Sequence, residues 1–224
     1  MIIAIDGFSG CGKSTTAKIV AKELGMRFVD TGAMYRATTL YFQRNFVRLT
    51  NEKDVEAALR FINVDFVFNK KFEKTETYLN GLRVEKEIRS MEVSRKVSEV
   101  AAIAQVRRAM VDLQQKMGKD GNIVMDGRDI GTAVFPEADF KFFMRADTEI
   151  RAARRQKELL EKGETVPLDQ IVENLEERDR IDSTREESPL RQAPDAYLLD
   201  TTNLTIESQV QYILRIVKET EVSN

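Results

Sequence analysis

The chain alternates short strand-like runs with longer segments in which apolar residues recur every three or four positions. The strand-like runs are residues 2–5, 27–30, 123–126, 140–144 and 196–199. Helical spacing follows the first run, at residues 13–24, and recurs near the end of the chain, at 206–220. Repeated alternation of strand and helix predicts a parallel sheet with helices on both faces. We therefore expect an α/β fold with a three-layer core around a five-stranded parallel sheet.

One segment departs from this alternation. Residues 63–68 alternate apolar and polar side chains with period two, and the segment 75–81 ends in Asn80-Gly81. An Asn-Gly pair is a strong signal for a two-residue hairpin turn. Residues 62–89 are therefore predicted to form a small antiparallel sheet inserted into the main domain.

Composition excludes several classes of chemistry. The 224 residues carry a net charge of −2 and no histidine, so imidazole serves neither as a general base nor as a metal ligand. The small net charge gives no basic field for nucleic acid, and no apolar run reaches the length of a membrane span. The single cysteine cannot form an intrachain disulfide, which fits a reducing compartment and a cytoplasmic location.

The segment GFSGCGKS, which follows the first strand, matches the phosphate-binding loop pattern G-x-x-x-x-G-K-[ST]. Glycines let backbone N–H groups converge on an anion, and the following helix N-terminus adds unpaired donors and partial positive charge. Lys13 offers a cation to the β- and γ-phosphates, and Ser14 offers a hydroxyl to Mg²⁺. The residues expected to bind ATP are Gly7, Phe8, Ser9, Gly10, Cys11, Gly12, Lys13, Ser14 and Thr15. We expect no catalytic role for Cys11.

Other features limit what this loop serves. A GTP-dependent switch needs D-x-x-G and N-K-x-D motifs, and neither occurs; the nearest match to the second is residues 69–72. A dinucleotide-binding turn would need glycine where Thr15 stands. A small P-loop kinase and a nucleotide-binding module without turnover remain.

Arginines are placed at helical spacing in two later segments. Arg178, Asp182 and Arg185 are spaced i, i+4 and i+7, and a second group comprises Arg151, Arg154 and Arg155. Charges on a helix usually form a solvated face. A phosphoryl-transfer site, however, must neutralise a triphosphate and an acceptor phosphate together, and the planar fork of arginine suits that task.

The sequence resembles bacterial-type cytidylate kinases over nearly its whole length. The resemblance is carried by IDGFSGCGKST, DTGAMYR, the predicted insert, DGRDIGTAVFP, RAARRQKELLEKG, ERDRIDSTR and DTTNLTIE. It implies transfer of the γ-phosphoryl group of ATP to CMP or dCMP with Mg²⁺. It also implies one kinase domain, 1–224, with a core (1–32, 118–150, 190–224), a monophosphate-binding region (33–117) and a mobile helical lid (151–189).

The resemblance also assigns roles to individual residues. Those implied to bind CMP are Thr31, Arg36, Ser98, Arg107, Arg128, Asp129, Arg178, Asp182 and Arg185. Those implied to be catalytic are Lys13, Arg128, Arg185, Arg154 and Arg155. Asp129 would accept a hydrogen bond from the cytosine amino group, where uracil has a carbonyl that a carboxylate repels. The implied partners are small nucleotides, with no nucleic acid, membrane or obligate protein, and the resemblance implies a monomer.

One implied pair conflicts with local geometry. Residues 92–117 read as one long helix, yet Ser98 and Arg107 are nine residues apart and would face opposite ways on it. Both can contact one base only if the helix breaks between them, so we expect a break at about residues 102–105. The alternatives to this family are another small-molecule P-loop kinase, of UMP/CMP or shikimate type, and a non-catalytic nucleotide-binding regulator.

Overall fold

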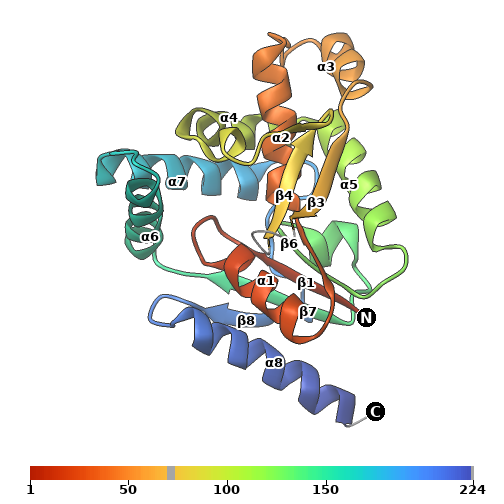
Figure 1. The fold of residues 1–224 in the computed structure, drawn as a ribbon, viewed down its shortest axis with the longest axis vertical. Helices are drawn as coiled ribbons and strands as arrows, with labels where there is room; N and C mark the ends of the chain where they lie inside the picture. The colour runs from red at the N-terminus through yellow and green to blue at the C-terminus, as the bar shows by residue number, and fades with distance from the viewer. Residues whose placement is uncertain (70–73, 223–224) are drawn as a thin grey trace. The chain divides into compact units, whose positions relative to one another are not determined.

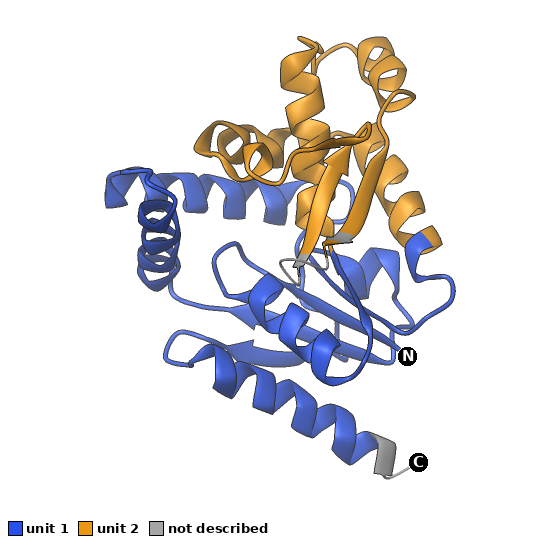
Figure 2. Cartoon of the chain, viewed as in Figure 1, with its two compact units in different colours: residues 1–29, 117–224 blue, residues 30–116 orange. Residues whose placement is uncertain are grey.

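The computed structural model describes residues 1–69 and 74–222. The chain divides into two compact units, which Figure 2 shows in different colours. Unit 1 comprises Met1–Val29 and Met117–Asn224, and unit 2 comprises Asp30–Lys116. In the part of the chain that is described, no helix has both the length and the apolar character to cross a membrane.

The central sheet has five strands, and each matches one of the runs expected from the sequence. They are β1 (Ile2–Gly7), β2 (Arg27–Asp30), β6 (Ile123–Gly127), β7 (Phe140–Arg145) and β8 (Tyr197–Asp200). Their spatial order is β2-β6-β1-β7-β8, and β1 pairs in parallel with both β6 and β7 (Figure 1). The predicted five-stranded parallel sheet is confirmed.

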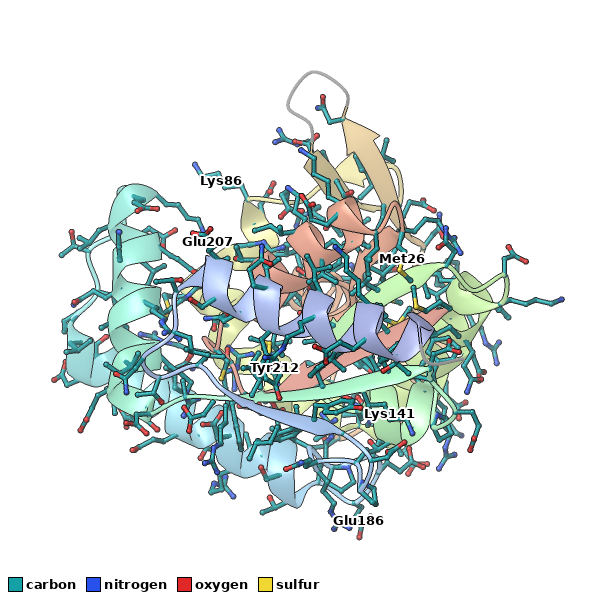
Figure 3. The ribbon with its side chains drawn as sticks, turned by 90° about the horizontal axis from the view of Figure 1, so that it is seen from below. Met26, Lys86, Lys141, Glu186, Glu207 and Tyr212 are labelled. Carbon is teal, nitrogen blue, oxygen red and sulfur yellow. The ribbon has the colours of Figure 1, made fainter. Side chains whose placement is uncertain are left out.

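Two helices of unit 1 pack on this sheet because each presents one apolar stripe. They are α1 (Lys13–Glu23) and α8 (Ile206–Val222). Ala17 and Val20 of α1, with Ile213 of α8, are fully buried against strand residues such as Ile5. Figure 3 shows α8 lying across the sheet. Tyr212 of this helix is partly buried and packs against the same core. This core fixes the carboxyl end of β1, where the glycine-rich loop begins.

Unit 1 also contains a helix pair and an unusual turn. The pair is α6 (Thr148–Glu161) and α7 (Leu168–Thr184), which pack through buried side chains that include Leu159 and Leu175. The turn η2 (Ile130–Val134) is a single π-helical turn after β6. Such turns are rare in proteins, and those that occur are often found at functional sites.

Unit 2 holds the predicted insert between helices. Its elements are α2 (Thr31–Arg44), α3 (Glu52–Leu59), β3 (Val64–Asn69), β4 (Lys74–Leu79), β5 (Leu82–Arg83), η1 (Glu87–Arg89), α4 (Met91–Ala102) and the greater part of α5 (Ala104–Gly118). The three strands form an antiparallel sheet, and Asn80 and Gly81 both have positive φ, as a type I′ hairpin turn requires. The predicted antiparallel insert is therefore confirmed; residues 70–73 within it lie outside the described residues.

The expected break in the long helical segment is also present. Helix α4 ends at Ala102, Ile103 has extended backbone angles (φ −69°, ψ 123°), and α5 begins at Ala104. The prediction of a break at about 102–105 is confirmed, and Ser98 and Arg107 lie on separate helices.

Candidate active site

The glycine-rich loop lies between β1 and α1, as a phosphate-binding loop requires. Gly7 has φ +142°, and a Cβ there would lie 1.9 Å from the Met144 carbonyl oxygen, so only glycine fits. Gly12 is the N-cap of α1 in the left-handed conformation (φ +91°), and no side chain caps the helix. The first N–H groups of α1 thus keep the donor capacity with which helix N-termini bind phosphate.

Lys13 is folded over this loop. Its side chain is buried and Nζ donates to the Phe8 carbonyl oxygen. Burial, and next the positive charge of Arg128, lower the pKa of Lys13 to about 8. Both effects penalise the ammonium form of Lys13, so an anion bound beside Nζ would stabilise that form.

Ser14 contacts a carboxylate from the neighbouring strand. Its hydroxyl donates to Asp126 Oδ2 at 2.7 Å, and Asp126 lies near the end of β6. A hydroxyl and a carboxylate at the start of α1 suit Mg²⁺, which takes oxygen ligands and usually binds one or two protein groups together with phosphates and water. The described residues contain no cluster of three or more acidic, cysteine or histidine side chains able to hold a metal ion. Asp126 begins the segment DGRDIGTAVFP that the sequence singled out, but it is not among the residues expected to bind Mg²⁺.

The loop and the start of α1 are held by hydrogen bonds from residues that are not among the expected site residues. Thr201 is fully buried, and its hydroxyl donates to the carbonyl oxygen of Cys11 at 3.0 Å. Thr16 donates to Gln209 of α8 at 2.7 Å, again with both side chains buried. Cys11 itself is buried, and burial raises the pKa of its thiol, which fits the expectation that it is not a nucleophile.

Acidic and basic residues from two distant segments meet in unit 1. Arg128 Nε lies 2.9 Å from Asp182 Oδ2 of α7. Arg185 Nη1 lies 3.7 Å from Asp182 Oδ1, and Arg185 Nη2 lies 3.6 Å from Asp129 Oδ1. Arg185 is the C-cap of α7 and not a member of the helix, so the i, i+7 face expected from spacing ends one residue early. These four residues, with Arg178, are called the arginine cluster below.

The buried charges of the arginine cluster shift one another's pKa values. Burial, followed by repulsion from Arg128, lowers the pKa of Arg178 to about 10. The pKa of Asp182 is lowered below its ordinary value, because the attraction of Arg128, Arg178 and Arg185 outweighs the opposing effect of burial. The cluster presents three guanidinium groups, whose planar sets of N–H donors suit the oxygens of an anionic ligand.

The three arginines expected in a lid have separate partners in this structure. Arg151 is buried, pairs with Asp179 at 2.7 Å and donates to the carbonyl oxygen of Ser9 in the phosphate loop at 3.1 Å. Arg154 donates to the Thr201 carbonyl oxygen at 2.6 Å. Arg155 pairs with the glutamate three residues later on α6, at 3.1 Å. Only Arg151 directly joins α6 to the phosphate loop among these contacts.

The other residues assigned to CMP by the resemblance lie in unit 2. They are Thr31, Arg36, Ser98 and Arg107. Asp30 caps α2 by accepting from Ala33 N at 3.0 Å, and its carboxylate also pairs with Arg89 at 2.8 Å. This cap fixes the first turn of α2, which carries Thr31, and Arg36 lies in the turn that follows. Ser98 and Arg107 are buried, and the Arg107 guanidinium lies over the Tyr35 ring.

These features together define a P-loop kinase. They are a parallel sheet with a phosphate loop after its first strand, a lysine and a serine at the start of the next helix, and an arginine cluster. Among solved structures, the fold is similar to TT1252 from Thermus thermophilus (TM-score 0.50, 15% identity, 98% of this chain and 97% of that one). It is also similar to an uncharacterized protein from Eubacterium ventriosum (TM-score 0.51, 10% identity, 98% of each chain). Both likenesses concern the fold alone.

Sequence comparison identifies the family. The family model described as cytidylate kinase matches residues 3–219. A cytidylate kinase from Cytophaga hutchinsonii is 58% identical over 96% of this chain and 92% of its own length. One from Parabacteroides distasonis is 52% identical over 96% of this chain and 95% of its own. The chain belongs to the cytidylate kinase family, which confirms the resemblance drawn from its motifs.

Proposed function

We propose that this protein transfers the γ-phosphoryl group of ATP to CMP and dCMP, yielding ADP and CDP or dCDP. Family membership is the observation that carries the proposal. The charge distribution of unit 1 supports it, because the phosphate loop and the arginine cluster interact: Arg128 lowers the pKa of Lys13. A kinase that transfers a phosphoryl group from a triphosphate to a second phosphate needs two cationic sites close together.

On the donor side, we assign the triphosphate to the loop. The N–H groups at the start of α1 and the ammonium group of Lys13 would bind its phosphate oxygens. Ser14 and Asp126 would hold Mg²⁺, which would neutralise negative charge on the phosphates. These residues would align the γ-phosphoryl group for transfer, and alignment is a large part of a protein's contribution to phosphoryl transfer.

On the acceptor side, we assign the monophosphate of CMP to Arg128 and Arg185. Asp129 would accept a hydrogen bond from the cytosine amino group, and Arg178 and Asp182 would contact the sugar. No general base is needed, because the attacking phosphate oxygen is already an anion. The roles of Thr31, Arg36, Ser98 and Arg107 stay predictions from the family resemblance.

The lid arginines belong to the same proposal. Arg154 and Arg155 would exchange their present partners for the transferring phosphoryl group, and closure would exclude water that otherwise hydrolyses ATP. The division into a core, a monophosphate-binding region and a lid, the monomeric state and a cytoplasmic location are also proposed. Size-exclusion chromatography with light scattering tests the monomer.

The direct test is ADP release from ATP and Mg²⁺ with a panel of acceptors: CMP, dCMP, UMP, AMP, GMP, shikimate and none. We expect turnover confined to CMP and dCMP. Turnover of UMP at similar efficiency would contradict the role of Asp129 while keeping the kinase. Absence of turnover with every acceptor, together with tight ATP binding, would favour a nucleotide-binding module.

Two variants connect the activity to residues. Lys13→Ala should lower kcat by several powers of ten, each tenfold loss being about 1.4 kcal/mol of transition-state stabilisation. Asp129→Asn should bring the kcat/KM values of CMP and UMP together, because the amide no longer repels the uracil carbonyl. Retention of full kcat by Lys13→Ala would contradict the assignment of the phosphate loop.

A further inference from the structure

Asp6 is a buried carboxylate that the proposed reaction does not use. It lies at the carboxyl end of β1, immediately before the phosphate loop, and its side chain is 4% exposed. Its two oxygens accept hydrogen bonds from consecutive backbone N–H groups, Ile130 N to Oδ1 at 2.8 Å and Gly131 N to Oδ2 at 2.7 Å. Both donors lie in the turn η2, so one side chain fixes two neighbouring peptide planes of that turn.

The hydrogen bond from Ile130 N to Asp6 holds the peptide group that joins Asp129 to Ile130. The carbonyl oxygen of Asp129 and the N–H of Ile130 belong to one planar unit. That carbonyl accepts from Ala133 N at 2.8 Å, while the N–H is held by Asp6. Asp129 has φ −149° and ψ 24°, outside the helix and sheet regions, so its direction depends on contacts that hold this peptide.

The second bond lies in a confined space. A Cβ on Gly131 would be 3.2 Å from the side-chain carbons of Lys141 and 3.4 Å from Asp6 Oδ2. Lys141, labelled in Figure 3, lies on β7; its Nζ donates to the Pro136 carbonyl oxygen and pairs with Asp195 at 2.7 Å. Asp6 therefore holds the start of the turn, and Lys141 holds the segment that follows its end.

Retaining a carboxylate here is unfavourable in itself. Burial is the largest effect and raises the pKa of Asp6 to about 7, with the nearby charge of Asp129 adding to it. The hydrogen bonds from Gly131 and Ile130 and the charge of Lys13 oppose the shift. Buried groups whose ionisation is penalised in this way are concentrated at functional sites.

We propose that Asp6 is a positioning residue that sets the direction of the Asp129 carboxylate, and through it the selectivity for cytosine, by holding the N–H groups of Ile130 and Gly131. The inference rests on the proposed function, in which Asp129 contacts the base. Asp6 itself touches neither nucleotide in this scheme.

The test compares kcat/KM for CMP with kcat/KM for UMP in Asp6→Asn. Asparagine has nearly the same shape but one acceptor oxygen, and its NH₂ group would face the second N–H donor. We expect the CMP-to-UMP ratio to fall about tenfold, as for the loss of one hydrogen bond to a charged group. The KM for ATP should change by less than about threefold, because the N–H groups lost from contact are not those of the phosphate loop.

A double variant separates positioning from general damage. If Asp6 acts through Asp129, then Asp6→Asn combined with Asp129→Asn should have the same CMP-to-UMP ratio as Asp129→Asn alone. A further fall in the ratio in the double variant would overturn the inference. So would an unchanged ratio in Asp6→Asn in an enzyme whose wild type prefers CMP.

Two more variants complete the experiment. Asp195→Asn removes the ion pair of Lys141 but keeps both Asp6 bonds, and is expected to leave the ratio unchanged. Gly131→Ala inserts a methyl group against Asp6 and Lys141, and should lower the ratio even if Asp6→Asn does not fold; an unchanged ratio there would contradict the inference. If the wild type does not discriminate CMP from UMP, the assignment of Asp129 fails and the inference about Asp6 is overturned with it.

Discussion

Replacing Asp182 by asparagine should destabilise the protein strongly, because this carboxylate neutralises buried arginines. Asp182 lies 2.9 Å from Arg128 and 3.7 Å from Arg185, and the side chains of the closer pair are 5% and 18% exposed. Removing one partner from a buried ion pair costs about 3–5 kcal/mol, since the other charge stays buried. Asparagine keeps one acceptor oxygen, so we expect the lower end, a loss of about 3 kcal/mol in the free energy of unfolding.

Urea unfolding at pH 7 measures this loss, with the m-value expected to stay constant. Glu177→Gln is the matched control on the same helix. The Glu177–Arg180 contact is shorter, 2.6 Å, but its side chains are 52% and 63% exposed, so we expect no measurable loss. A midpoint for Asp182→Asn that coincides with that of Glu177→Gln would refute the reasoning, because burial and not distance is what separates the two.

The difference in unfolding free energy between wild type and Asp182→Asn should depend on pH, and the direction of that dependence follows from the pKa of Asp182. The folded protein lowers the pKa of Asp182 below its ordinary value of 3.8. The stability contributed by its ionised form is therefore present above that ordinary value and is lost as the pH falls through the folded pKa. The gap between wild type and Asp182→Asn should persist from pH 7 to about 4 and close only at more acidic pH. Inorganic phosphate should stabilise the variant more than the wild type, because it replaces the missing negative charge.

Three further predictions follow from the phosphate loop. The pKa of Lys13 in the free protein is lowered to about 8, so kcat/KM for ATP should fall as the pH rises through about 8, where the ammonium group is lost; a flat profile from pH 7 to 9 would contradict this. Asp126→Asn should raise the Mg²⁺ concentration needed for half-maximal activity about tenfold, measured by Mg²⁺ titration at fixed ATP, while Ser14 keeps its hydroxyl. Gly7→Ala should prevent stable folding, since its Cβ would lie 1.9 Å from the Met144 carbonyl oxygen, and thermal unfolding followed by circular dichroism would detect a variant that folds normally.

The elements that the sequence predicted correctly are those whose signal is local. The glycine-rich loop and the Asn80-Gly81 turn depend on backbone angles that few other residues adopt, so the local order of residues locates them. The break at Ile103 was different, since nothing in the local pattern interrupts the helix. It was predicted only because Ser98 and Arg107 could not otherwise face one ligand, which is an argument from function to backbone.

What the sequence could not predict depends on strand order and on distant partners. Ser14 meets Asp126 because β6 lies beside β1, a neighbour relation across 112 residues that spacing does not encode. The same limit applies to the lid arginines: spacing placed Arg151, Arg154 and Arg155 on one helix, yet their partners come from α7, the loop after β8 and α6 itself. A helix pattern fixes which face a side chain is on, but not which group it contacts.

Arg128 explains why the phosphate loop and the arginine cluster should be considered together. After burial, its charge is the next largest cause of the lowered pKa of both Lys13 and Arg178. Each of these cations is therefore less stable in the folded protein than in water, and part of that cost comes from the same neighbour. An anion bound near Arg128 relieves repulsion on both sides, so a phosphate at the cluster should also favour the charged form of Lys13. The proposed donor and acceptor sites would in this way be coupled through the charge of Arg128.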